Sequence, residues 1–163
     1  MRRSRLLTIL AVSAVALCAA AGTACGGSDD DPGGLSKSAF AKQANALCSK
    51  AKADRNAQLQ QLPPNPSGAA DAQKLQGISS IDRELIRRVD ALVPPQTEQD
   101  RVDKVLDAWR QRATAEDQYA AAVGAMQDPA TLAGVTANLA QIDATTDPVA
   151  IQLGLTECTR GTP

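Results

Sequence analysis

Residues 75–93 read LQGISSIDRELIRRVDALV, and this stretch decides the fold class. Apolar side chains recur in it at steps of three and four residues, the spacing of one face of an α-helix. They are Leu75, Ile78, Ile81, Leu85, Val89 and Leu92. The charged residues fall mostly on the opposite face: Arg83, Glu84, Arg87, Arg88 and Asp90. The pattern predicts a helix over 68–93, which Pro94-Pro95 ends because a proline pushes the residue before it out of the helical region.

The same spacing continues on both sides of this stretch. Ser36 is placed to cap a helix over 36–62 that Pro63-Pro64 stops. Its apolar face carries Phe40, Ala44, Leu47, Cys48 and Ala51. A third helix is predicted over 96–126, with an inward face of Val102, Val105, Leu106, Trp109, Ala113, Ala120 and Val123. On its outer face we expect ordinary surface pairs, Asp100 with Lys104 and Arg112 with Glu116.

Two Asp-Pro pairs follow, and each offers a helix cap followed by the proline favoured at the first helical position. Asp128-Pro129 is predicted to open a short fourth helix through Ile142, and Asp147-Pro148 to open a separate last helix over 149–155. Strand and hairpin signals are absent. We therefore expect residues 36–163 to form an all-α, antiparallel up-and-down bundle of four to five helices.

The N-terminal segment has the layout of a bacterial lipoprotein signal. Arg2, Arg3 and Arg5 precede an apolar run over 6–21, and Gly22-Thr23-Ala24 leads into Cys25. We expect residues 1–24 to be removed and Cys25 to be lipidated, which would anchor the chain to the outer face of the cell membrane. A plain secretory signal is the alternative. Residues 25–35 are rich in Gly, Ser, Asp and Pro and are expected to form a flexible tether.

Cysteine usage leaves one pair for the folded domain. Of the four cysteines, Cys18 leaves with the signal and Cys25 takes the lipid, so Cys48 and Cys158 remain. In an oxidising compartment these two favour a disulfide. The competing interpretation is a metal site, but zinc prefers about four nitrogen or sulfur ligands and the chain has no histidine.

Charge and composition narrow the classes of function. Without the three arginines of the signal, 14 basic residues stand against 18 acidic ones, and this balance argues against nucleic acid as a partner. The absence of histidine excludes Ser-His-Asp and Cys-His catalysis, and the carboxylates Asp103, Asp107, Glu116 and Asp117 are expected on solvated faces. We therefore expect no enzyme, no catalytic residue, no metal and no cofactor.

Three residues remain as candidate contacts for a ligand or a partner: Asn45, Trp109 and Tyr119. Each also has a structural interpretation, since Asn45 is placed to bond a helix end or loop and Trp109 lies on the inward face of its helix. Two hypotheses of function follow, an interaction module that docks on another envelope protein, and a binder of small molecules between helices. The low aromatic content disfavours the second.

Several of these residues also form a longer pattern. Phe40, Ala44, Asn45 and Cys48 are followed by Leu92-Val93-Pro94-Pro95 and by Gly154-Leu155-Thr156-Glu157-Cys158. This pattern resembles that of small actinobacterial proteins that are secreted or lipid-anchored and carry an Asn-x-x-Cys and a C-terminal Gly-Leu-x-x-Cys motif. The resemblance implies a helical domain and pairing of the two cysteines, and it implies no activity.

Overall fold

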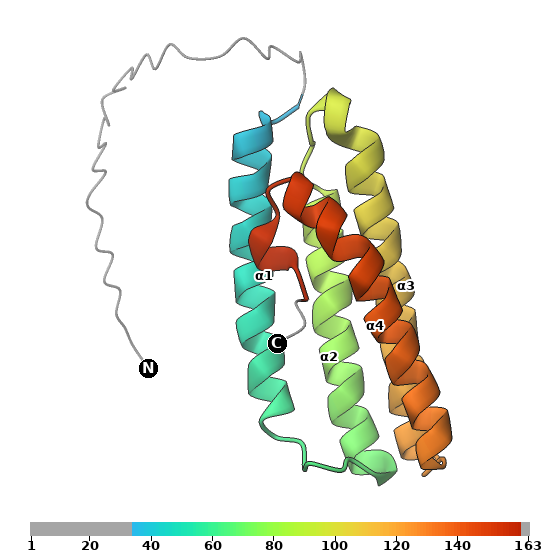
Figure 1. Cartoon of the computed structure of the whole chain (residues 1–163). Helices are drawn as coiled ribbons and strands as arrows, with labels where there is room; N and C mark the ends of the chain where they lie inside the picture. The colour runs from blue at the N-terminus through green and yellow to red at the C-terminus, as the bar shows by residue number, and fades with distance from the viewer. Residues whose placement is uncertain (1–33, 161–163) are drawn as a thin grey trace, which may run out of the picture.

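The computed structural model describes residues 34–160, in which four α-helices and two short 3₁₀ turns occur and no strand is found. The helices are α1 (Lys37–Leu59), α2 (Gly68–Asp90), α3 (Gln99–Gly124) and α4 (Pro129–Gln152), and the turns are η1 (Gln96–Glu98) and η2 (Thr156–Cys158). The helices alternate in direction along the chain (Figure 1). The predicted all-α antiparallel bundle with one disulfide is thereby confirmed. The signal segment, Cys25 and residues 26–33 of the predicted tether lie outside the described residues.

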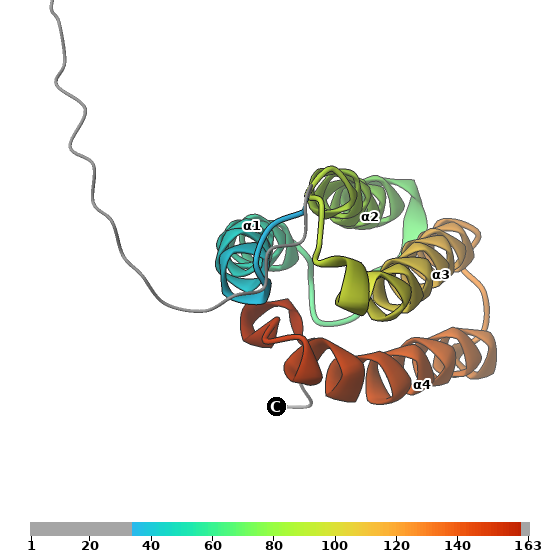
Figure 2. The same ribbon diagram turned by 90° about the horizontal axis from the view of Figure 1, so that it is seen from above.

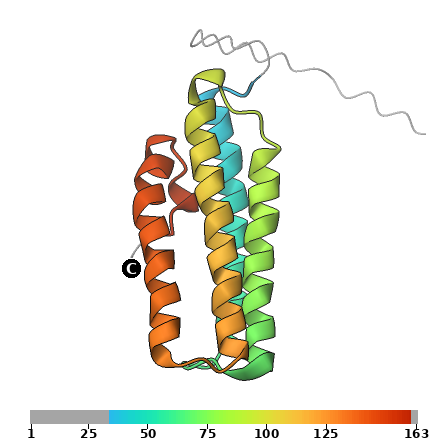
Figure 3. The ribbon, with the colours of Figure 1, turned by 90° about the vertical axis from the view of Figure 1, so that its right-hand side faces the viewer.

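Neighbours in sequence are neighbours in space: α1 packs on α2, α2 on α3, and α3 on α4. Seen along the bundle axis, the four helices surround a common centre (Figure 2). The C-terminal segment with η2 lies between α1 and α4 and contacts both. Seen from the side, α4 stands beside α3 along its length (Figure 3). Within the described part of the chain, the ring of helices is therefore closed between α1 and α4 by a short segment at one end only.

The helix starts follow the sequence signals. Ser36 caps α1, since its hydroxyl accepts the backbone N–H of Ala39 at 3.3 Å. Asp128 caps α4, and its Oδ1 accepts the N–H of Ala130 at 2.9 Å and of Thr131 at 3.1 Å. Pro129 then occupies the first helical position, as predicted.

The predicted break at Asp147-Pro148 is wrong, because α4 continues through Pro148 to Gln152. Proline removes one backbone donor from a helix interior but keeps a helical φ. Two residues on the same face, Thr146 and Ala150, are buried on either side of Pro148, so burial holds the helix together there. Asp147 does not cap a new helix; its carboxylate instead accepts the backbone N–H of Arg160, 3.1 Å from each oxygen. The C-terminal segment thus uses the group that was expected to start a fifth helix.

The core consists of two apolar clusters. The larger one, which we call the closed half, is built around large side chains that are 1–4% exposed: Phe40, Leu106, Trp109, Leu153 and Leu155. The smaller one, which we call the open half, is built around Leu75, Ile78, Ala120 and Val123. In the open half the apolar residues of α4 are only half-buried: Leu132, Val135, Leu139 and Ile142. α4 therefore covers one end of the bundle less completely than the other.

Candidate functional site

The C-terminal segment is fastened to α1 by a disulfide and by Asn45. Cys48 and Cys158 are bonded, with their Cα atoms 4.9 Å apart, as predicted. Asn45 donates from Nδ2 to the carbonyl of Gly154 at 2.8 Å, and its Oδ1 accepts the N–H of Glu157 at 3.0 Å. Both ends of the Asn45 amide are used in this way, so the structural interpretation of this candidate contact is the one that the geometry supports.

The two aromatic candidates lie in different halves of the bundle. Trp109 is 4% exposed and belongs to the closed half, where it packs as a core residue. Tyr119 is partly buried, packs against the cluster of the open half, and lines a cleft described below. Asn45 and Trp109 do not line this cleft.

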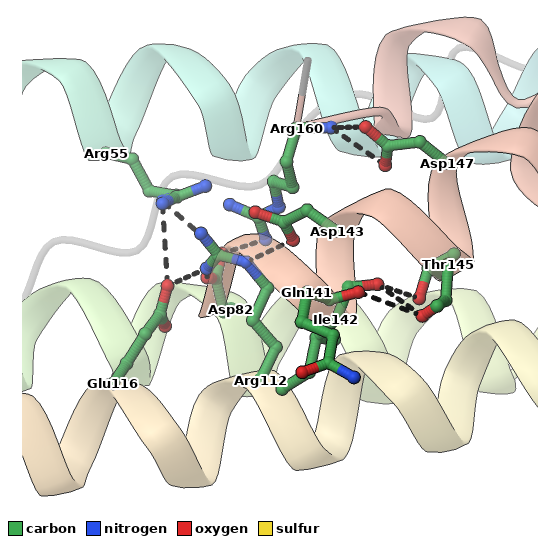
Figure 4. Close-up of polar contacts among 11 residues, drawn as sticks. Arg55, Asp82, Arg112, Glu116, Gln141, Ile142, Asp143, Thr145, Asp147 and Arg160 are labelled. Atoms are coloured by element: carbon green, nitrogen blue, oxygen red, sulfur yellow. Dashed lines mark hydrogen bonds and ion pairs between the residues drawn. The ribbon is translucent and has the colours of Figure 1, made fainter. Parts of the chain in front are cut away.

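Between the two apolar clusters lie six charged side chains, which we call the charged layer. They come from every helix and from the C-terminal segment: Arg55 of α1, Asp82 of α2, Arg112 and Glu116 of α3, Asp143 of α4, and Arg160. Figure 4 shows the three arginines converging on the carboxylates. Asp82, Arg112 and Glu116 are buried, at 2%, 8% and 8% exposure.

Arg112 and Asp82 are the centres of the charged layer. Arg112 contacts Glu116 one turn along α3, and its Nε donates to Asp143 Oδ1 at 2.8 Å. Its Nη1 also lies 3.5 Å from Asp82 Oδ2. Asp82 Oδ1 lies 2.7 Å from Arg160 Nη2 and 3.6 Å from Arg55 Nε. Two of the charges come from α3 and one from each other part, so the layer links all four helices and the C-terminal segment.

Burial shifts the proton affinity of two members of this layer. It raises the pKa of Asp82 to about 6, while the guanidinium groups of Arg55 and Arg112 limit the rise. Burial also lowers the pKa of Arg55, against the opposing effect of Asp82. Arginine remains charged at any pH at which proteins fold, so of these two residues Asp82 is the one whose charge changes near neutrality.

The prediction that Arg112 and Glu116 form a surface pair is wrong, since both are buried in the charged layer. Asp82 was missed for a related reason, because charged residues were assigned to outer faces. The spacing of the apolar residues could nevertheless have predicted that Asp82 is buried. Asp82 lies four residues after Ile78 and three before Leu85, on the apolar face itself. A charge at such a position needs a partner from another helix.

A cleft of about 150 Å³ opens beside the charged layer, in the open half. All four helices contribute to it, and its apolar wall consists of Leu59, Leu75, Ile78 and Leu139. Its polar end is formed by Arg55, Arg112 and Glu116, with Tyr119 at the side. The cleft therefore joins an apolar chamber to buried charges.

A second hollow, of about 320 Å³, lies between α1 and α2, and we call it the α1–α2 groove. Its floor is apolar, with Leu47, Ala51, Ile81 and Leu85. Its rim is charged and polar, with Lys50, Asp54, Ser80, Glu84 and Arg88. No group of three or more metal-ligating side chains is found in the described part of the chain, and none of its helices has the length and hydropathy that crossing a membrane requires.

Comparisons with protein families, with curated proteins and with solved structures each found no match to this chain. Function must therefore be argued from the α1–α2 groove and the cleft.

Proposed function

We propose that this protein is a lipid-anchored lipoprotein on the outer face of the cell membrane, whose helical bundle binds another envelope protein through the α1–α2 groove. The observation that carries the proposal is the groove itself, a hollow of about 320 Å³ with an apolar floor and a rim of polar and charged residues. An amphipathic helix of a partner fits such a groove by placing its apolar face on the floor. An apolar centre with a polar rim is also the usual composition of a protein interface.

The charges at the rim define the kind of helix that fits. Lys50 pairs with Asp54 at 2.7 Å, and Glu84 pairs with Arg87 at 2.6 Å. Arg88 forms no ion pair within the described residues. Its charge acts on the carboxylate of Glu84, but a partner helix that carries an acidic residue beside its apolar face would give Arg88 a direct ion pair. We therefore infer that the partner presents an acidic, amphipathic helix.

The groove is tested by crosslinking in intact cells. A photo-crosslinking residue at Ser80, which is exposed at the rim, should give one discrete adduct with another envelope protein. The same photo-crosslinking residue at Thr136, exposed on α4, is the matched control and should give no adduct.

Arg88→Glu should reduce the adduct at Ser80 about tenfold, as expected for loss of a charged contact. Lys42→Glu changes charge equally at an exposed position outside the groove and should leave the adduct unchanged. Equal adducts at Ser80 and Thr136, or equal effects of the two charge reversals, would contradict the proposal.

The anchor is tested separately, by feeding cells a clickable fatty acid. The arginines and the apolar run before Cys25 support lipidation at this residue. Wild-type protein should take up the label and Cys25→Ala should not. Label retained by Cys25→Ala would refute lipidation at Cys25, but it would not bear on partner binding through the α1–α2 groove.

A further inference from the structure

A smaller hollow lies behind the floor of the α1–α2 groove, on the side of the C-terminal segment. It measures about 70 Å³, and we call it the inner hollow. The groove is lined by α1 and α2 alone, whereas Cys158 and Arg160 of the C-terminal segment also line the inner hollow. Ala51 of α1 and Leu85 of α2 line both spaces. The contact between α1 and α2 at these two residues, which we call the seam, is therefore thin, with space on either side.

One ion pair ties α1 to α2 beside the seam. Among the described residues, Arg55 and Asp82 form the only ion pair that joins these two helices. Arg55 lies four residues after Ala51 and Asp82 lies three residues before Leu85, so each is about one helical turn from the seam. The groove floor therefore depends on a contact in the charged layer.

The tie between Arg55 and Asp82 is held by charge. Arg55 Nε and Asp82 Oδ1 are 3.6 Å apart, which is too long for a hydrogen bond, and Arg55 Nε has no hydrogen-bond partner. The other ion pair of Arg55 is with Glu116 of α3, at 3.5 Å. A proton on Asp82 would therefore remove the attraction toward α2 and leave Arg55 the attraction toward α3.

The surroundings of Asp82 allow its charge to change near neutral pH. Charged groups face it from every other part of the bundle (Figure 4): Arg55 of α1, Arg112 of α3, Asp143 of α4 and Arg160 of the C-terminal segment. Burial raises the pKa of Asp82 to about 6, against the effect of Arg55 and Arg112. At the groove rim, by contrast, the hydrogen bond with Arg87 lowers the pKa of Glu84. Mild acid therefore discharges Asp82 before Glu84.

We propose that Asp82 is a proton-sensitive tie of the α1–α2 groove: its ionised form holds α1 to α2 through Arg55, and a proton on Asp82 loosens the seam and weakens binding of the partner helix. The inference rests on the proposed function of the groove. A groove of fixed width binds more tightly, because less ordering is required when the partner docks.

The size of the effect follows from the fraction of Asp82 that is ionised. Apparent affinity falls in proportion to the fraction of protein in the form that can bind. With a pKa of about 6 for Asp82, this fraction falls about tenfold between about pH 8 and about pH 5.

The first measurement requires no partner. In the oxidised, methyl-labelled full chain, nuclear Overhauser cross-peaks between the floor methyl groups of α1 and those of α2 report the width of the seam; these residues are Leu47, Ala51, Ile81 and Leu85. We expect the cross-peaks between the helices to weaken as pH falls through about 6, the pKa of Asp82. Cross-peaks between Val102 and Leu106, both in α3, are the internal control and should not change.

The second measurement uses the photo-crosslinking residue at Ser80 in intact cells. The adduct should fall about tenfold between about pH 8 and about pH 5. Asp82→Asn cannot titrate, so it should give the low adduct at both pH values. Asp107→Asn removes an exposed carboxylate of α3 that lies outside the groove, and it should keep the pH response of the wild type.

The two measurements separate the tie from the proposed function. If no adduct forms at either pH, docking in the groove is contradicted, whereas floor cross-peaks that weaken in mild acid would still support the tie. The wild-type pH series decides this even if Asp82→Asn fails to fold. Floor cross-peaks that do not change with pH, an adduct of equal yield at both pH values, or a pH response retained by Asp82→Asn would each overturn the tie.

Discussion

The closed and open halves of this bundle are built from the same helices, but they bury their apolar residues to different degrees. In the closed half Phe40, Leu106 and Leu155 are 1–2% exposed, and the disulfide and Asn45 hold the C-terminal segment over them. In the open half no segment among residues 34–160 covers the space between α1 and α4, and Leu132 and Leu139 remain half-buried. Apolar burial is thus concentrated at one end, and the cleft lies at the other end. Binding regions are commonly drawn from the less stable parts of a fold.

Leu106→Ala is the largest expected loss and tests whether the closed half carries the stability. Leu106 is 2% exposed and belongs to the larger cluster, so its removal leaves a cavity that the surrounding helices cannot fill. We expect the free energy of unfolding to fall by about 4 kcal/mol, measured by urea denaturation. A loss below about 1 kcal/mol, typical of an exposed site, would show that the closed half is not tightly packed.

Removing the disulfide tests how far the closed half depends on its C-terminal segment. Cys48 and Cys158 are separated by 110 residues in sequence, so the bond restricts the unfolded chain strongly. Cys48→Ser and Cys158→Ser should each lower the free energy of unfolding by about 3 kcal/mol. The double variant should lose little more than either single one, because all three remove the same link. Additive losses would contradict this account.

The charged layer between the halves is tested by pH. Burial raises the pKa of Asp82 to about 6 in the folded protein, above its value of 3.8 when exposed. The folded state therefore binds the proton more tightly, and the stability that this supplies is present below about pH 4 and is lost as pH rises through about 6. The groups that face Asp82 are Arg55, Arg112, Arg160 and Asp143.

Asp82→Asn isolates this contribution, because asparagine does not titrate. The free energy of unfolding of the wild type minus that of Asp82→Asn should fall by on the order of 2 kcal/mol between pH 4 and 7. Chemical denaturation at several pH values measures it. Asp117→Asn is the control. Asp117 is a surface carboxylate paired with Arg83, and its hydrogen bond with Arg83 is the main cause that lowers the pKa of Asp117. A difference that rises with pH for Asp82→Asn would refute the assignment.

The sequence predicts the apolar residues of both halves better than the charged layer between them, for a physical reason. Burial of large apolar residues leaves a regular three- and four-residue spacing, which identified Phe40, Leu106 and Trp109 as core. The cysteine count likewise predicted the disulfide. The charged layer leaves a weaker signal, since only the position of Asp82 on the apolar face of its helix points to a buried charge. Arg112 and Glu116 were therefore placed on the surface, and the burial of Asp82 depends on arginines from other segments.

The sequence also failed to predict that α4 continues through Pro148. Asp147-Pro148 has the composition of a helix start, and local chemistry alone favours a break. The packing of Thr146 and Ala150 against the bundle decides otherwise.

Leu139→Ala is the smallest expected effect and the sharpest comparison with Leu106→Ala, since the two remove the same atoms from opposite halves. Leu139 is half-buried and already borders a space of about 150 Å³, so truncation enlarges an existing cleft instead of creating a new cavity. The cost depends on how much packing is lost, and here we expect less than about 1 kcal/mol. Urea denaturation of both variants under one set of conditions measures the difference. Equal losses at Leu106 and Leu139 would mean that the two halves are packed alike.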